Sequence, residues 1–234
     1  MYVAQQHQLD EERAWQLVCQ LGVGQFVSLA SGQFDASLLP FNVVRDGERA
    51  MLQAHVNRVN PQWRSPGAAM VIVTGPQTHI AGTDLPAEKP EAKMPVVPTW
   101  NYITVHLHGH FTIHDDPAWK REHLARLVAA HEDTWRPETH SNYQRINNAL
   151  NALVGIEFEV EKIAGKAKLG QNMAAMEIRD TAQRLRARDP LAAPVADAME
   201  EIAVPWALAR EARVENARQA GRSTLPIALP DVEF

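Results

Sequence analysis

The chain has 234 residues, of which 45% are apolar and 22% are charged, a composition typical of a soluble globular protein with a buried core. Its formal net charge of −5 excludes a protein that attracts nucleic acid through a general positive field. The one cysteine, Cys19, excludes an internal disulfide framework and a cysteine-based zinc site, and we expect it to be a small core residue.

The N-terminus has no basic segment followed by an apolar run, so we expect no signal peptide. No stretch reaches the roughly 18–20 apolar residues that a membrane span needs. We therefore expect a cytoplasmic protein without a membrane partner.

The first half of the chain predicts one helix and then a series of strands. Residues 9–21 carry an apolar stripe at helical spacing, behind acidic residues that favour a helix N-terminus. Short β-like runs follow at 25–30, 36–44 and 50–56, and Ser31-Gly32 and Asp46-Gly47 between them are typical of hairpin turns. The apolar run Gly67–Gly75 predicts a buried strand.

The second half predicts two long strands and several helices. Proline-rich residues 81–98 predict a loop, and the alternating residues 101–113 predict a strand. Asp115-Asp116-Pro117 is typical of a helix start, so we expect a helix to about residue 130 and another over 141–153. Residues 154–163 alternate strictly, which predicts a strand with Ile156, Phe158 and Val160 inward.

From Met173 onward the pattern is helical, with a break at Asp189-Pro190. Residues 177–222 hold as many acidic residues as arginines, which favours solvated helix faces over a DNA-binding stripe. Strands joined by short turns, without helices between the early ones, indicate a small antiparallel barrel with helical additions rather than a parallel βαβ fold. We expect a barrel domain over 1–172, a helical extension over 173–222 and a tail over 223–234.

Polar residues after the strand at 50–56 are the first candidate site. Arg58 can hold a phosphate or carboxylate through paired hydrogen bonds, and Asn57 and Asn60 can bind a polar ring, with His55 beside them. The same residues can instead build the turn before Pro61, with Arg58 paired to a surface acid. Local composition favours the turn.

Two further groups allow a binding role or ordinary structure. Trp100 and Tyr102 share a strand face with Asn101 opposite, which suits stacking on a flat ring or packing. Lys166, Lys168, Gln171 and Asn172 follow the 154–163 strand and can meet an anion or form a solvated turn. His106, His108 and His110 share a face, but their spacing of about 6.5–7 Å disfavours one shared metal.

Nucleotide-binding glycine loops, a P-loop and a G-x-S-x-G elbow are all missing from the sequence. This argues against nucleotide-fold dehydrogenases, P-loop enzymes and α/β-hydrolases.

The motifs resemble, in order, those of the PaiB-like family of FMN-binding negative transcriptional regulators over most of residues 1–200. The matching stretches are Met1–Val3, Ala36–Phe41, His55–Trp63, Gly75-Pro76, Val97–Tyr102, Val105–Gly109, His131-Glu132, Val154–Ile156 and Lys168–Asn172.

The resemblance implies an α+β fold, an antiparallel split β-barrel of the FMN-binding type, like that of pyridoxamine-phosphate oxidases, with peripheral helices and a helical C-terminal extension. It implies a homodimer with FMN at the subunit interface. The implied cofactor-binding residues are His55, Asn57, Arg58, Asn60, Thr99, Trp100, Asn101, Tyr102, Lys168, Gln171 and Asn172.

The chain departs from the family pattern at four places. Residues 79–89 replace a Tyr-Ile-Ser-Pro-Ser-Trp-Tyr-x-x-Lys type segment, with Lys89 or Lys93 as a substitute lysine. Asn57 stands where alanine is common, Gly170 where serine is usual and Met173 where arginine is usual. Apart from Asn57, these departures remove polar side chains that the resemblance implies next to the FMN phosphate.

A second resemblance is to piperazate synthases, which share the fold, bind haem and form an N–N bond. Residues 55–61 of this chain read His-x-Asn-Arg-x-Asn-Pro, which resembles the corresponding motif of those enzymes. In that case His55 is the axial iron ligand, a role that histidine often fills.

Three functions follow from these resemblances. The first is an FMN-dependent redox protein that acts on a small molecule. The second is a haem enzyme of the piperazate synthase kind, with haem b on His55. The third is a ligand-sensing regulator, for which the charge balance and the lack of a helix-turn-helix argue against direct DNA reading.

Overall fold

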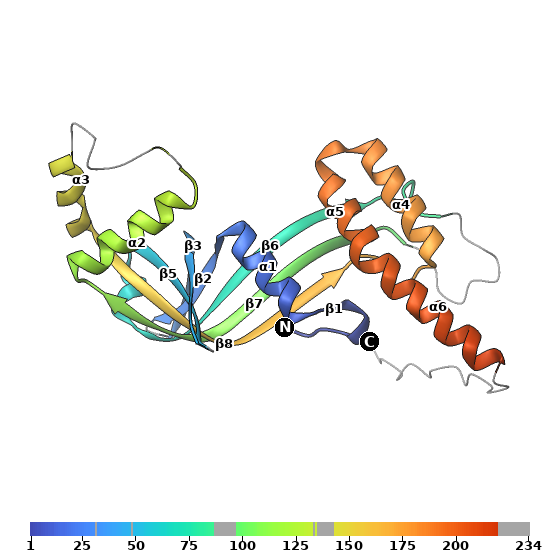
Figure 1. Cartoon of the computed structure of the whole chain (residues 1–234), viewed down its shortest axis with the longest axis horizontal. Helices are drawn as coiled ribbons and strands as arrows, with labels where there is room; N and C mark the ends of the chain where they lie inside the picture. The colour runs from blue at the N-terminus through green and yellow to red at the C-terminus, as the bar shows by residue number, and fades with distance from the viewer. Residues whose placement is uncertain (31, 48, 87–96, 133, 135–142, 220–234) are drawn as a thin grey trace. The chain divides into compact units, whose positions relative to one another are not determined.

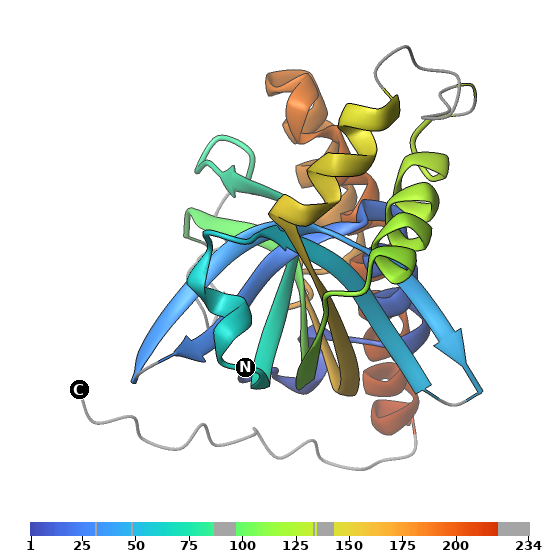
Figure 2. The ribbon, with the colours of Figure 1, turned by 90° about the vertical axis from the view of Figure 1, so that its left-hand side faces the viewer.

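The computed structural model describes residues 1–30, 32–47, 49–86, 97–132, 134 and 143–219. The strands form one eight-stranded sheet in the order β3-β2-β6-β7-β8-β5-β4, with β1 beside β8 (Figures 1 and 2). The strands are β1 Gln8–Leu9, β2 Val23–Ala30, β3 Gln33–Pro40, β4 Asn42–Asp46, β5 Arg49–Asn57, β6 Gly67–Ile80, β7 Thr99–His114 and β8 Leu153–Lys168. The pairs β1–β8, β2–β3, β2–β6, β4–β5 and β5–β8 are antiparallel.

Helices lie before, between and after these strands. The α-helices are α1 Glu11–Leu21, α2 Pro117–Ala129, α3 Tyr143–Ala149, α4 Ala175–Arg188, α5 Ala193–Ala198 and α6 Val204–Gln219. Short 3₁₀ turns are η1 Gln5–His7, η2 Pro61–Arg64, η4 Leu150–Ala152 and η5 Pro190–Ala192, and η6 Met199–Ala203 is a π-helical turn. None of the described helices combines the length and the apolar character that crossing a membrane needs.

The chain divides into two compact units. Of the described residues, those within 1–3, 8–75 and 103–166 form the first unit, and those within 4–7, 76–102 and 167–219 form the second. The strands β6, β7 and β8 have residues in both units. The domain boundary that we expect at 172/173 stays a prediction, whereas residues 76–86 and 97–102 cluster with the helical extension.

The first unit curls around an apolar interior. Phe26, Leu39, Leu52, Val71 and Phe158, from β2, β3, β5, β6 and β8, line the same internal space. Since β3 and β5 lie towards opposite ends of the strand order, side chains from both can meet only if the sheet curls. This confirms the predicted α+β class with an antiparallel barrel-type sheet, peripheral helices and a helical C-terminal extension.

Local signals explain most element boundaries. Asp10 accepts a hydrogen bond from Arg13 N at the start of α1, and Gly22, with φ 59°, ends it. Asp116 caps α2 through Trp119 N at 2.8 Å, as the Asp-Asp-Pro signal predicts. Both predicted hairpins are present, between β2 and β3 and between β4 and β5.

The structure corrects two predictions. The single strand expected over 36–44 is two strands, β3 and β4, which lie at opposite ends of the strand order. Pro40 ends β3 because it cannot donate to a ladder, and Phe41 turns its buried ring into the core. Cys19 is exposed and is not a core residue, because it lies on the outer face of α1.

Two expected segments are longer or shorter than predicted. The strand expected over 154–163 continues to Lys168, and Ile156 and Phe158 are buried as expected, with Val160 half-buried. The helix expected over 141–153 is α3 and η4, and its first two residues lie outside the described part of the chain, as do residues 87–96 of the loop and the tail after 219.

Candidate functional site

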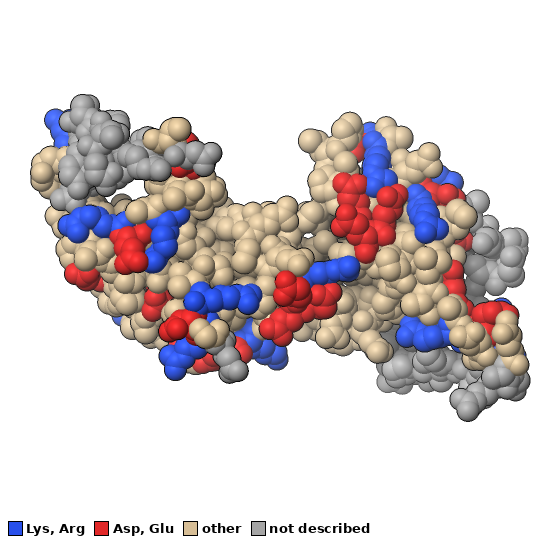
Figure 3. Space-filling view, viewed as in Figure 1, with Lys and Arg blue, Asp and Glu red and all other residues tan. Residues whose placement is uncertain are grey.

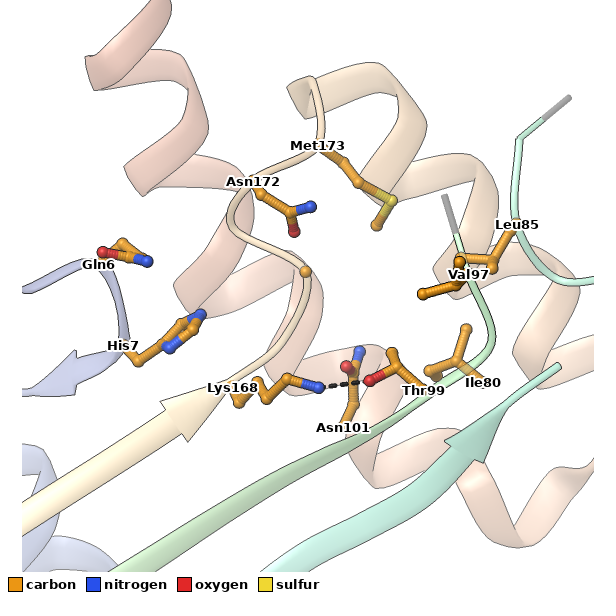
Figure 4. A pocket seen from close by; sticks show the side chains of 11 residues that line it. Gln6, His7, Ile80, Leu85, Val97, Thr99, Asn101, Lys168, Asn172 and Met173 are labelled. Carbon is orange, nitrogen blue, oxygen red and sulfur yellow. Dashed lines mark hydrogen bonds between the residues drawn. The ribbon is translucent and has the colours of Figure 1, made fainter. Parts of the chain in front are cut away.

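A pocket in the second unit gathers several predicted cofactor residues. Its volume is about 280 Å³, close to the lower end of ligand pockets. Polar side chains occupy one part of its wall and apolar side chains the rest (Figure 4). The lining residues are Gln6, His7, Ile80, Leu85, Val97, Thr99, Asn101, Lys168, Gly170, Asn172 and Met173.

Lys168 gives the pocket a cationic group. Its Nζ atom donates a hydrogen bond to Thr99 Oγ1 (Figure 4) and another, at 2.9 Å, to the carbonyl oxygen of Trp100. The last residue of β8 and the first of β7 therefore place an ammonium and a hydroxyl side by side. An ammonium with a neighbouring hydroxyl is a suitable partner for a phosphate or carboxylate.

Asn101 gives the pocket a buried acceptor. The residue is 2% exposed, and its Nδ2 atom donates to Met199 Sδ at 3.5 Å. Its Oδ1 atom is buried and has no hydrogen-bond partner among the described residues. Because leaving a buried acceptor unsatisfied is costly, this oxygen suits a ligand N–H or O–H group.

The loop after β8 is built by Gln171. Its Oε1 accepts from Leu169 N at 2.8 Å and its Nε2 donates to Ala167 O at 2.7 Å. Gly170 has φ 85°, a left-handed conformation that favours glycine over serine. Gln171 thus shapes the loop, and Asn172 is the exposed amide that lines the pocket.

Arg210 of α6 clamps the same loop, and sequence reasoning missed it. Its guanidinium donates to Gln171 O and Met173 O, both at 2.7 Å. A bidentate pair of this kind holds two carbonyls at a fixed spacing. No local pattern around Arg210 distinguishes it from the other arginines of the extension.

The two aromatic candidates do not line this pocket. Strand alternation turns Thr99 and Asn101 to one face of β7 and Trp100 and Tyr102 to the other, as predicted. Trp100 is 48% exposed and its Nε1 donates to Gln77 Oε1 at 3.2 Å.

The described part of the divergent 79–89 segment supplies apolar pocket wall. Ile80 and Leu85 line the pocket, and buried Asp84 accepts from Ala81 N at 2.8 Å. Arg184 and Arg188 of α4 hold this segment: Arg184 donates to Leu85 O at 2.7 Å, and Arg188 pairs with Asp84 at 3.1 Å. Lys89 and Lys93 lie outside the described residues.

The other predicted cofactor residues lie in the first unit, where most of them build the turn after β5. Arg58 binds Asp115 and donates to Asn151 O at 2.9 Å and to Leu153 O at 3.2 Å. Hydrogen bonds from Arg58 and Lys120 hold the pKa of Asp115 down at about 2. The alternative of an arginine paired with a surface acid is what the structure shows.

Both asparagines of this motif have turn partners. Asn57 Oδ1 accepts from Val59 N at 3.1 Å, and Asn60 Oδ1 accepts from Gln62 N at 2.9 Å to cap η2. Gln62, which sequence reasoning missed, is 1% exposed and bonds Ser28, Ser37 and the carbonyl of Asp35. A buried glutamine in a polar loop carries no sequence signal that separates it from an exposed one.

His55 alone of this motif joins a different cluster. Its Nδ1 lies 3.0 Å from Nε2 of His123, which is fully buried on α2. Burial lowers the pKa of His55. The pKa of His123 is lowered to about 4, mainly by burial and to a smaller extent by the charges of His55 and Arg126. Trp119 stacks on the His123 ring with centroids 5.3 Å apart. Both imidazoles are therefore neutral near pH 7.

This cluster does not fit an axial iron ligand at His55. Asn42 Nδ2 donates to His123 O at 3.0 Å and lies 3.2 Å from His123 Nδ1. The amide N–H of Asn42 needs an acceptor, so His123 Nδ1 must be unprotonated. The proton of a neutral His123 then lies on Nε2, which donates to His55 Nδ1. The proton of His55 then lies on Nε2, the atom that would have to bind iron.

The three alternating histidines form no metal site in the part of the chain that the structure describes. His106 and His108 have ring centroids 6.3 Å apart, and His110 Nδ1 pairs with Glu161 Oε1 at 2.6 Å.

The chain is similar to a curated protein and to several solved structures. It is 26% identical over 196 residues to "Protease synthase and sporulation protein PAI 2" of Bacillus subtilis, covering 81% of this chain and 91% of that protein. Among solved structures, the FAD and haem binding protein of Mycobacterium smegmatis is 17% identical, with a TM-score of 0.49 over 71% of this chain and 75% of that one. A flavocytochrome of Azotobacter vinelandii is 16% identical, with a TM-score of 0.46 over 69% and 68%.

A family model, described as "Putative FMN-binding domain", matches residues 1–162, more than half of the sequence. The chain therefore belongs to this FMN-binding domain family.

Proposed function

We propose that this protein binds FMN and uses it for redox chemistry on a small molecule. The observation that carries the proposal is the pocket of the second unit, which is lined by the hydrogen-bonded pair Lys168 and Thr99 and by Asn101, whose Oδ1 has no partner among the described residues. Family membership supports flavin as the ligand class.

The residues of the pocket fit the ribityl phosphate end of FMN. Lys168 and Thr99 would hold the phosphate as cation and hydroxyl, and Asn101 Oδ1 would accept from a ribityl hydroxyl. Ile80, Leu85 and Met173 supply apolar wall of the same pocket. When bound, FMN supplies the hydride- and electron-transfer chemistry, for which this chain provides binding and orientation.

Arg58 and Asn60 do not enter this proposal, because Arg58 Nε and Nη2 and both side-chain polar atoms of Asn60 already have partners within the first unit. The haem alternative is not the function that we propose, because the hydrogen bonds of His55 put the proton on the atom that would bind iron.

A DNA-reading regulator is also not what we propose. Acidic and basic side chains are interspersed over α4–α6 on the face seen in Figure 3. Arg186, for example, binds both Asp197 and Glu200. Such neutralised arginines are poor phosphate-backbone contacts.

The test is reconstitution of the purified protein with FMN, followed by its visible spectrum and by quenching of flavin fluorescence. We expect saturable uptake, and an affinity loss of about tenfold or more in Lys168→Met, since a charged hydrogen bond contributes about 1.5–3 kcal/mol. Lys162→Met, which removes an exposed lysine of the first unit, is the matched control and should bind normally. Wild-type protein that takes up no FMN contradicts the proposal.

We also propose a homodimer, supported by an exposed apolar face on β2 and β3. The strand register places Leu29 beside Phe34 and Gln25 beside Leu38. The side chains of Leu29, Phe34 and Leu38 are 50%, 78% and 62% exposed. Apolar side chains gathered on one sheet face are typical of protein contact surfaces. Light scattering should report a dimer that Phe34→Lys with Leu38→Lys converts to monomer; a monomeric wild type contradicts it.

A further inference from the structure

Three residues of the first unit form a one-way chain of hydrogen bonds. Asn42 begins β4, His123 lies on α2, and His55 lies near the end of β5. Asn42 Nδ2 is 3.2 Å from His123 Nδ1, and His123 Nε2 is 3.0 Å from His55 Nδ1. The direction of each bond decides where the protons of the two imidazoles lie.

The carbonyl oxygen of His123 fixes that direction. It can only accept, and Asn42 Nδ2 lies 3.0 Å from it, so the amide atom facing His123 is the nitrogen. An amide nitrogen can only donate, so His123 Nδ1 is unprotonated. A neutral His123 then carries its proton on Nε2 and donates to His55 Nδ1.

The last step concerns His55 itself. Because its Nδ1 accepts, a neutral His55 carries its proton on Nε2. This atom has no hydrogen-bond partner among the described residues, and it is not enclosed. The side chain of His55 is half-buried, so it offers an N–H to its surroundings from a fixed ring.

We propose that Asn42 and His123 are positioning residues that hold His55 as an outward hydrogen-bond donor. His55 then recognises an acceptor atom of a bound molecule, such as a carbonyl oxygen or an unprotonated ring nitrogen, and does not ligate a metal. A metal-bound histidine needs the opposite arrangement, in which its second nitrogen donates to a neighbouring acceptor. This assignment goes beyond the proposed flavin function and does not depend on it.

Burial of the pair supports the assignment. The ring of His123 is stacked against Trp119, and burial lowers the pKa of both histidines, so that neither carries a second proton near pH 7. A second proton on His123 would face the Asn42 amide, which is also a donor.

The direct test is the tautomer of each ring, read from two-bond nitrogen–proton correlation spectra of protein labelled with ¹⁵N-histidine at pH 7.5. We expect both His123 and His55 as Nε2–H tautomers. A His55 that carries its proton on Nδ1 overturns the proposal without any ligand being added.

Asn42→Asp tests whether Asn42 sets the direction. A carboxylate accepts, so His123 should now carry its proton on Nδ1 and accept from His55, which switches both rings to the Nδ1–H tautomer. Asn148→Asp adds the same charge at an exposed position of α3 and should leave both tautomers unchanged. Folded Asn42→Asp protein, checked by circular dichroism, in which both rings keep Nε2–H overturns the positioning role.

Haemin titration gives a second readout. We expect His55→Ala and wild-type protein to give the same Soret spectrum, because His55 offers a proton and not a lone pair. A histidine-ligated spectrum that is present in wild-type protein and lost in His55→Ala overturns the proposal.

Discussion

His123 couples the stability of the protein to pH. It is 0% exposed, and its pKa in the folded protein is about 4, against an ordinary value of 6.5. The cause is burial, followed by the nearby charges of His55 and Arg126. Between these two pH values the unfolded chain binds a proton that the folded protein does not bind.

The folded state is therefore favoured above pH 6.5 and loses stability as the pH falls towards 4. The shift corresponds to a loss of about 3 kcal/mol in the free energy of unfolding. Urea unfolding measured between pH 7.5 and 4 checks this expectation. His123→Phe should lower stability at pH 7.5, because the ring hydrogen bonds to Asn42 and His55 are lost, and should flatten the slope between pH 6.5 and 4. An unchanged slope would contradict the role of His123.

Individual residues were the hardest part of this site to predict. The Asn57, Arg58 and Asn60 motif was open between a pocket and a turn, and the structure gives Asn57 and Asn60 partners within the turn. The partners of Arg58, Asp115 and Asn151, lie far away in the sequence. The unsatisfied oxygen of Asn101 and the clamp of Arg210 likewise depend on tertiary contacts that no local pattern encodes.

At the scale of elements, α2 can lie on the sheet because Gly155 on β8 has no side chain. A Cβ atom at this position would lie 2.2 Å from the Trp119 ring. That ring also stacks on His114, with centroids 4.4 Å apart and planes 3° from parallel. The missing side chain at Gly155 therefore leaves the space that the Trp119 ring of α2 occupies.

Gly155→Ala should therefore lower the free energy of unfolding by about 1–3 kcal/mol, as overpacking does. Combining it with Trp119→Leu should cost less than the sum of the two single changes, because the smaller side chain relieves the contact. Denaturant titration of the four proteins measures the coupling. Strictly additive losses would show that Gly155 and Trp119 do not compete for the same space.

Element positions followed well from the sequence where a periodic pattern or a cap was present. The capped helices α1 and α2 and the alternating β8 lie where the sequence predicts them. The division of residues 36–44 into β3 and β4 was missed because Pro40 and Phe41 lie inside a continuous apolar pattern, and only the register shows that the chain changes to the other end of the sheet.

At the scale of the whole molecule, the segment that departs most from the family pattern belongs with the C-terminal extension. Residues 76–86, 97–102 and 167–219 lie in the same compact unit. The described part of the divergent segment carries Ile80 and Leu85 into the pocket wall, and α4 holds it through Arg184 and Arg188. The sequence identified the segment as unusual, but its attachment to α4 joins residues about a hundred positions apart and has no local signal.

The ion pair between Asp84 and Arg188 should therefore control the pocket without touching a ligand. Asp84 is 2% exposed and lies 3.1 Å from Arg188, which also donates to His79 O at 2.8 Å. Arg188→Gln leaves the buried carboxylate without its cation, which should lower stability by about 1–3 kcal/mol. Loosening of Ile80 and Leu85 should weaken FMN binding several-fold in the same variant.

Asp84→Asn with Arg188→Gln should recover part of both losses, because no buried charge is then left unpaired. Arg218→Gln, which removes an exposed arginine at the end of α6, is the control and should change neither property. Fluorescence titration with FMN and denaturant unfolding of the same samples separate the two effects. If Arg188→Gln loses stability and still binds FMN like the wild type, the extension supports the fold of the second unit and does not shape its pocket.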